Sequence, residues 1–155
     1  MPDSPALCTE LLFTATIQVA PTIDLGPSPL GERRMVPILS GTLEGPKIKG
    51  RILPGGIDWQ LVRADKVTEI EAHYCLETDD GVLIRVINKG YRHGPTEVMQ
   101  RLGAGDPVDP SEYYFRAIPT LEAPCGRYEW LNRALFVSSG ERSAEAVLLR
   151  VYEIL

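Results

Sequence analysis

The sequence predicts an all-β protein: a single antiparallel, largely up-and-down β-barrel of eight to ten strands with one or two short helical turns. Three observations predict it. Apolar and polar residues alternate in short segments along the 155 residues, as in strands half-buried against a core. Turn residues separate these segments at short intervals. Several strands are long and the hairpins are consecutive, which favours closure into a calycin-like barrel that holds one small ligand or is filled by side chains.

The central hairpin spans residues 67–90, VTEIEAHYCLETDDGVLIRVINKG. Asp79-Asp80-Gly81 suits a three-residue loop in which the glycine takes the left-handed conformation. This loop pairs Ala72 with Asn88 and leaves one face apolar except for Tyr74 and Asn88. A two-residue loop would oppose apolar residues to charged ones, so the hydrophobic pattern selects the register.

The preceding strand, residues 57–63, joins this hairpin through Ala64-Asp65-Lys66. A second three-residue loop pairs Asp58 with Ala72 and brings Gln60 to the same inner face. Lysine is a poorer left-handed residue than glycine, so this register rests on weaker turn chemistry than the first.

The N-terminal third adds three extended segments. Residues 33–43, with Pro37 at an edge or bulge, and residues 47–53 are predicted strands. Residues 21–31 hold three prolines and two glycines and predict a loop long enough to cover an opening. Residues 7–19 predict a strand whose inward residues are Leu7, Leu11, Phe13, Ala15, Ile17 and Val19.

Beyond the hairpin, a short helix is predicted at 96–102, ended by Gly103. Asp109-Pro110-Ser111-Glu112 has the residues of an N-capped helical turn, and residues 128–133 predict another turn. Extended segments follow at 113–122, 134–138 and 146–155, the last two around a turn at 139–142.

The charge and composition of the chain indicate which classes of partner and compartment to expect. The net charge is −5 and no basic run occurs, so a nucleic-acid partner is not expected. No apolar stretch approaches the ~20 residues that span a bilayer, and the N-terminus lacks the basic region of a signal peptide. Three widely spaced cysteines, Cys8, Cys75 and Cys125, indicate reduced thiols. We expect one cytoplasmic domain over residues 1–155, with residues 1–6 flexible.

The predicted inner row Asp58, Ala72 and Asn88 is the strongest chemical signal. A carboxyl group among apolar neighbours has a raised pKa and can act as a general base, while Tyr74 and Asn88 can donate to a developing oxyanion. Each also has a structural interpretation: Asp58 as the partner of an arginine or of loop amides, Tyr74 as core, and Asn88 as a loop anchor.

No motif points to a metal or a cofactor. His73 falls on the charged face, and His93 lies in a loop near the barrel mouth; neither has the spacing of a zinc site. The sequence contains no G-x-S-x-G and no G-x-G-x-x-G, so no nucleophile elbow or dinucleotide loop is expected.

The stretches LPGGIDWQ, TDDG, VDPSEYYFR and WLN together resemble the bacterial and fungal family called domain of unknown function 3237, from about Leu11 to Leu155. The resemblance implies a single-domain barrel with a central cavity. Lys66 departs from the glycine that the family often has there. By resemblance, the cavity candidates are Asp58, Trp59, Tyr74, Asn88, Arg116, Trp130 and Asn132.

These residues support two functional hypotheses. The first is a cofactor-independent isomerase, cyclase or lyase that moves a proton on a small aromatic or carbonyl metabolite. Asp58 would be the base, Tyr74 and Asn88 the hydrogen-bond donors, and Arg116 the group that orients an anion. The second hypothesis is a barrel that binds a small molecule without turnover. A purely structural role ranks last. The sequence also allows a homodimer formed through an edge strand. Further ligand-binding candidates are Trp59, Gln60, Trp130, Asn132 and His93.

Overall fold

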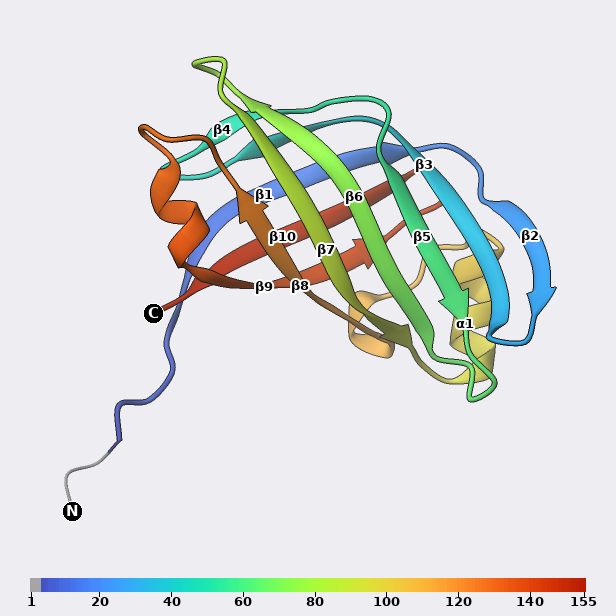
Figure 1. Ribbon diagram of the computed structural model, residues 1–155. Helices are drawn as coiled ribbons and strands as arrows, with labels where there is room; N and C mark the ends of the chain where they lie inside the picture. The colour runs from blue at the N-terminus through green and yellow to red at the C-terminus, as the bar shows by residue number, and fades with distance from the viewer. Residues whose placement is uncertain (1–3) are drawn as a thin grey trace.

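A computed structural model describes residues 4–155 and shows one antiparallel sheet that closes into a barrel (Figure 1). The strands are β1 (Thr9–Val19), β2 (Ile23–Ser28), β3 (Gly31–Glu44), β4 (Lys49–Ile52), β5 (Ile57–Val62), β6 (Thr68–Thr78), β7 (Leu83–His93), β8 (Tyr114–Glu122), β9 (Leu135–Arg142) and β10 (Ala146–Ile154). Around the barrel they follow the order β1, β10, β9, β8, β7, β6 and β3. Strands β4 and β5 both pair with β6 and β3, and β3 pairs back to β1. The predicted all-β, largely up-and-down barrel is confirmed.

Helical structure is confined to the two ends of the barrel. Helix α1 (Thr96–Gly103) and a 3₁₀ turn, Glu129–Arg133, lie at opposite ends (Figure 1). A second 3₁₀ turn, Pro110–Glu112, carries the predicted capping box. Among residues 4–155, no helix combines the length and the apolar character needed to cross a membrane. Of the segment predicted to be flexible, residues 1–3 lie outside the described residues, and residues 4–6 are exposed and belong to no strand.

Both predicted hairpin registers are confirmed. Ala72 pairs with Asn88 across β6 and β7, and Gly81 takes a positive φ of 83° in the loop. Asp58 pairs with Ala72 across β5 and β6. Lys66 adopts a φ of 70°, so a lysine occupies the left-handed position that closes the second loop.

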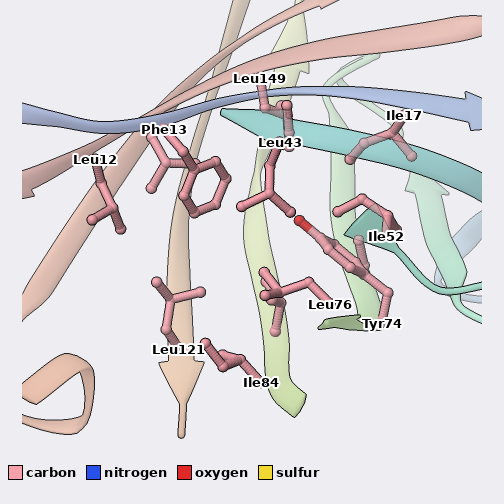
Figure 2. Close-up of a cluster of buried hydrophobic side chains, with 14 of the residues drawn as sticks. Leu12, Phe13, Ile17, Leu43, Ile52, Tyr74, Leu76, Ile84, Leu121 and Leu149 are labelled. Atoms are coloured by element: carbon pink, nitrogen blue, oxygen red, sulfur yellow. The ribbon is translucent and has the colours of Figure 1, made fainter. Parts of the chain in front are cut away.

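The interior is apolar over most of its length. Figure 2 shows leucine, isoleucine and phenylalanine side chains from opposite walls meeting inside the barrel, with the Tyr74 ring among them. Phe13, Leu76 and Ile84 are at most 1% exposed, and each such side chain contributes about 1.5–3 kcal/mol on burial. A second cluster, which includes Leu102 of α1 and Phe115 of β8, lies beneath the helix. Packed apolar side chains therefore fill most of the barrel, and at the α1 end a smaller apolar cluster lies beside polar groups.

The predicted loop at residues 21–31 is wrong. Residues 23–28 form β2, which among residues 4–155 pairs with β3 alone and is therefore an edge strand. Proline is tolerated at an edge because the missing N–H has no ladder partner to lose. The register shifts between Asp24 and Gly26, where Gly26 takes a φ of 91°, so the glycine marks a bulge.

The predicted turn at 139–142 is also wrong, because β9 continues to Arg142 and the chain reverses at residues 143–145. Gly140 lies within the strand for packing reasons: a Cβ atom there would stand 2.8 Å from the Phe115 ring. Strand β8 carries this ring inward, and the glycine makes room for it.

The first strand departs from strict alternation. A register shift between Leu11 and Phe13 indicates a bulge, which places two successive side chains on one face. Leu12 and Phe13 are both buried, whereas Leu11 is 38% exposed and Leu7, outside the strand, is 81% exposed. The predicted inward positions of Leu7 and Leu11 are therefore wrong.

Candidate functional site

Three neighbouring strands bring the polar candidates together inside the barrel. Asp58 on β5, Ala72 on β6 and Asn88 on β7 are direct partners in one row. Tyr74 lies two residues along β6 on the same face and is 7% exposed. Because Ala72 has only a methyl group, the polar side chains on either side of it face the same space.

The carboxyl group of Asp58 is buried and only half bonded. Gln60 Nε2 donates a 2.8 Å hydrogen bond to Asp58 Oδ2, while Oδ1 is buried and accepts no hydrogen bond from a described residue. Burial raises the pKa of Asp58, and the hydrogen bond from Gln60, the charges of Arg92 and Arg142 and a weak interaction with the Glu71 backbone, outside hydrogen-bond geometry, offset this only in part. A carboxyl group held in this way exchanges a proton closer to neutral pH than an exposed one does.

Two further polar groups point inward without partners among residues 4–155. Asn88 Oδ1 is buried and accepts no hydrogen bond. The Tyr74 hydroxyl makes no hydrogen bond to a described side chain, and burial, with the nearby charge of Asp58, raises the pKa of Tyr74. Tyr74 therefore stays protonated and keeps a proton to donate. Unpaired buried polar groups are rare in native proteins and call for an explanation.

A buried arginine, which sequence reasoning missed, completes the polar network. Arg92 on β7 is 5% exposed, and its Nη2 donates to Gln60 Oε1 at 3.4 Å. Its guanidinium group lies 5.4 Å from the centre of the Phe115 ring, and its Nε has no partner among the described residues. Burial, followed by repulsion from Arg142, lowers the pKa of Arg92 to about 10. Asn88, Gly90 and Arg92 share one parity, so extending the hairpin by two residues would have found it.

Two more arginines stand near the mouth of the barrel. Arg142, at the end of β9, donates from Nη2 to Thr22 Oγ1 at 3.5 Å, and burial lowers its pKa. Arg34 on β3 lies 3.7 Å from Glu32 and shares the parity of the buried Val36. Strand parity could have identified Arg34, whereas Arg142 fell in the segment predicted as a turn.

These groups border a cavity of about 700 Å³ at the α1 end of the barrel. Its wall includes Gln60, three arginines, and the apolar side chains of Met99 and Leu102 from α1. Gln60 and Arg92 line this cavity. Asp58, two residues from Gln60 on the same face of β5, does not line it and lies behind Gln60, to which it is hydrogen-bonded.

Three of the predicted ligand-binding residues lie on the outer surface. Arg116 is exposed, donates to the Phe115 carbonyl at 2.9 Å and lies 5.7 Å from the centre of the Tyr114 ring. His93 is exposed and stacks on the same ring at 4.9 Å. Trp59 lines a separate concavity of about 900 Å³ outside β5–β8. None of the three shares the inner face with Asp58.

The last two candidates belong to the far end of the barrel. Trp130 is half-buried, with the Lys47 ammonium 5.3 Å from its ring centre. Asn132 accepts from the Ala123 N–H at 3.1 Å and donates to the Ala123 and Glu129 carbonyls at 2.9 and 3.0 Å. These bonds tie the 3₁₀ turn to the end of β8. Within residues 4–155, no three His, Cys, Asp or Glu side chains gather as a metal site would require.

Fold and site together define a closed antiparallel β-barrel with a carboxyl group, a carboxamide and a phenol inside and arginines at one mouth. The chain belongs to the family described as protein of unknown function (DUF3237), whose model matches residues 7–154. The crystal structure of the conserved protein of unknown function RPA1785 from Rhodopseudomonas palustris is 41% identical; the match covers 98% of this chain and 100% of that one, with a TM-score of 0.94.

Two other solved structures share the architecture. A β-barrel-like protein from Acinetobacter baumannii is 40% identical over the full length of both chains, with a TM-score of 0.86. A structure described as an enzyme from Penicillium herquei also covers both chains completely with a TM-score of 0.74, but at 18% identity it shares the fold alone.

Proposed function

We propose that the barrel is a cofactor-independent enzyme that moves a proton on a small carbonyl or aromatic metabolite bound in its cavity. The observation that carries the proposal is Asp58: a buried carboxyl group with a raised pKa and one oxygen left without a hydrogen bond. A structural carboxylate of this kind would be expected to have both oxygens bonded. The unbonded Oδ1 is the atom that would accept a proton from a substrate that displaces Gln60 or passes it.

The chemistry follows from the positions of the three groups. The ionised Asp58 removes a proton from a carbon next to a carbonyl group, and the electron pair moves to the carbonyl oxygen as an enolate. A hydrogen bond from the Asn88 amide or the Tyr74 hydroxyl stabilises that oxygen. Return of the proton to another atom gives an isomer or a cyclised product, and loss of a neighbouring leaving group gives an elimination product.

Exchange of carbon-bound hydrogen tests this step without knowledge of the natural substrate. Acetylacetone and aryl ketones are incubated with the protein in D₂O, and the loss of the α-proton signal is followed by NMR. The wild type is expected to accelerate exchange, and Asp58→Asn, which keeps the shape and the acceptor for Gln60, is expected to lose about 10²–10⁴-fold of that rate. Asp79→Asn, in the exposed hairpin loop, is the matched control. Equal exchange by the wild type and Asp58→Asn overturns the proposal.

A second candidate is ligand binding without turnover. The observation that favours it is Gln60, which is 1% exposed and bonds both Asp58 and Arg92, so that it stands between the cavity and the carboxyl group. Under this alternative, a compound that binds the wild type is recovered unchanged and shows no exchange of its carbon-bound hydrogen after long incubation.

A further inference from the structure

The wall of the 700 Å³ cavity is unbalanced in charge. It contains four cationic side chains, Arg34, Lys66, Arg92 and Arg142, and one carboxylate, Asp24. Asp24 Oδ1 already accepts a 2.8 Å hydrogen bond from the Gly26 N–H. The protein as a whole carries a charge of −5, so this local excess of positive charge is opposite to the character of the rest of the molecule.

The arginines are poorly neutralised by the protein itself. Within residues 4–155, neither Arg92 nor Arg142 forms an ion pair, and Arg34 has only a 3.7 Å contact with Glu32. Arg92 is 95% buried, yet it leaves Nε unpaired. Burial lowers the pKa values of Arg92 and Arg142. Repulsion adds to this, from Arg142 and Arg34 on Arg92 and from Arg34 on Arg142, and the charge of Asp58 offsets only part of it. Arrangements of this kind are costly unless an anion completes them.

We propose that Arg34, Arg92 and Arg142 form an oxyanion site that binds a carboxylate or phosphate group of a small organic ligand. The inference rests on the proposed function only in placing the ligand in this cavity. Guanidinium groups present paired N–H donors that match the oxygens of carboxylates and phosphates. It also replaces the predicted role of Arg116, which lies outside the barrel.

The other walls indicate how such a ligand lies. Met99 and Leu102 of α1 and Val62 of β5 contribute apolar side chains to the wall of the cavity. A volume of about 700 Å³ is within the range of small-molecule sites. An organic anion would place its charged group on the arginines and its apolar body along α1, with its reactive carbon directed towards Gln60 and Asp58.

Titration calorimetry with three probes of similar size tests the assignment: benzoate, phenyl phosphate and the neutral benzyl alcohol. We expect at least one anion to bind the wild type at least tenfold more tightly than benzyl alcohol. Arg142→Gln, at the mouth and not in the core, should weaken that anion ten- to a hundredfold. Arg116→Gln removes the same charge from the outer surface and should leave binding unchanged. Circular dichroism verifies that each variant is folded.

The outcomes distinguish a carboxylate ligand from a phosphate ester, and they test the oxyanion site separately from the proposed acid–base activity. Preference for benzoate identifies a carboxylate ligand, and preference for phenyl phosphate identifies a phosphate ester. Failure of both anions to bind, or equal binding by the wild type and Arg142→Gln, overturns the oxyanion site. Hydrogen exchange on neutral ketones is independent of it: exchange without anion binding leaves only the acid–base proposal standing, and anion binding without exchange leaves only the oxyanion site.

Discussion

Gln60 and Asp58 lie two residues apart on β5, and their side chains are joined by a 2.8 Å hydrogen bond from Nε2 to Oδ2. Residues at this spacing share a face of the strand, so the amide fixes the carboxyl group from the cavity side. It satisfies one oxygen and leaves the other buried and unbonded. The consequence is a carboxyl group that is held in position yet destabilised in its charged form.

Asp58→Asn is therefore expected to stabilise the folded protein at neutral pH. The pKa of Asp58 is raised in the folded state, so its favourable contribution is complete below the pKa of the unfolded chain and is lost as the pH rises through the folded-state pKa. Asparagine does not ionise and avoids this loss.

The measurement is the thermal midpoint of wild type and variant from pH 3.5 to 8. The midpoints should nearly coincide at the acid end and separate in favour of the variant as the pH rises. Asp79→Asn controls for the loss of one negative charge. A variant that becomes progressively less stable than the wild type as the pH rises would show that the carboxylate is a net stabilising partner of Arg92 and Arg142.

Lys66→Gly should stabilise the barrel by roughly 0.5–1 kcal/mol. Lys66 holds a φ of 70°, a conformation that costs a residue with a side chain roughly 1–2 kcal/mol, and the greater freedom of glycine in the unfolded chain offsets part of the gain. Chemical denaturation measures the change. The reverse substitution, Gly81→Lys, tests the equivalent position of the central hairpin and should destabilise the protein. If both substitutions changed the stability in the same direction, the backbone explanation would be refuted.

Gly140→Ala should destabilise by about 1–3 kcal/mol, the usual cost of overpacking. The new Cβ atom would lie 2.8 Å from the Phe115 ring, and Arg92 lies over the same ring, so ligand affinity should fall as well. Gly103→Ala is the control for stability alone, since no atom lies within 4 Å of its added Cβ but Gly103 lines the cavity; ligand affinity is compared with that of the wild type. Denaturation and calorimetry on both variants check this; two neutral substitutions would show that the ring moves freely.

Asn132→Ala should cost about 1–3 kcal/mol of stability without changing ligand binding. The side chain makes three hydrogen bonds to backbone groups of Ala123 and Glu129, each worth about 0.5–1.5 kcal/mol, at the end of the barrel away from α1. Asn132→Asp keeps the acceptor and loses the donor, so an intermediate loss is expected. Weakened benzoate or phenyl phosphate binding in a stable variant would restore Asn132 to the ligand site.

The parts of the fold and site that were predicted correctly are those that depend on local pattern. Loop length and alternation place Asp58, Ala72 and Asn88 in one row, and both are visible in the sequence. The same alternation reaches Arg92, but only if β7 is extended past Gly90. Arg142 was missed because Gly140 led to the prediction of a turn at residues 139–142. The structural reason for this glycine is its contact with the Phe115 ring, and the sequence does not show a contact between such distant segments.

The family resemblance identified residues that match the family's motifs but did not indicate what those residues do in the structure. Arg116 and Asn132 match family motifs, yet Arg116 points outward because Phe115 and Ala117 on either side of it are buried, and Asn132 bonds the backbone. Parity along β8 was available from the sequence and excludes Arg116 from the interior. The bonds of Asn132 depend on how the 3₁₀ turn folds back on β8, which no local pattern specifies.

Closure of the barrel joins the beginning of the chain to its end, since Thr9 of β1 pairs with Ile154 of β10. Contacts between such distant residues slow folding, and β1 and β10 are the two strands that join β3, which carries Arg34, to β9, which carries Arg142. A nascent chain can acquire the arginine-lined site only after its last strand has left the ribosome. Ligand binding during refolding would therefore report the final closure event rather than the earlier hairpins.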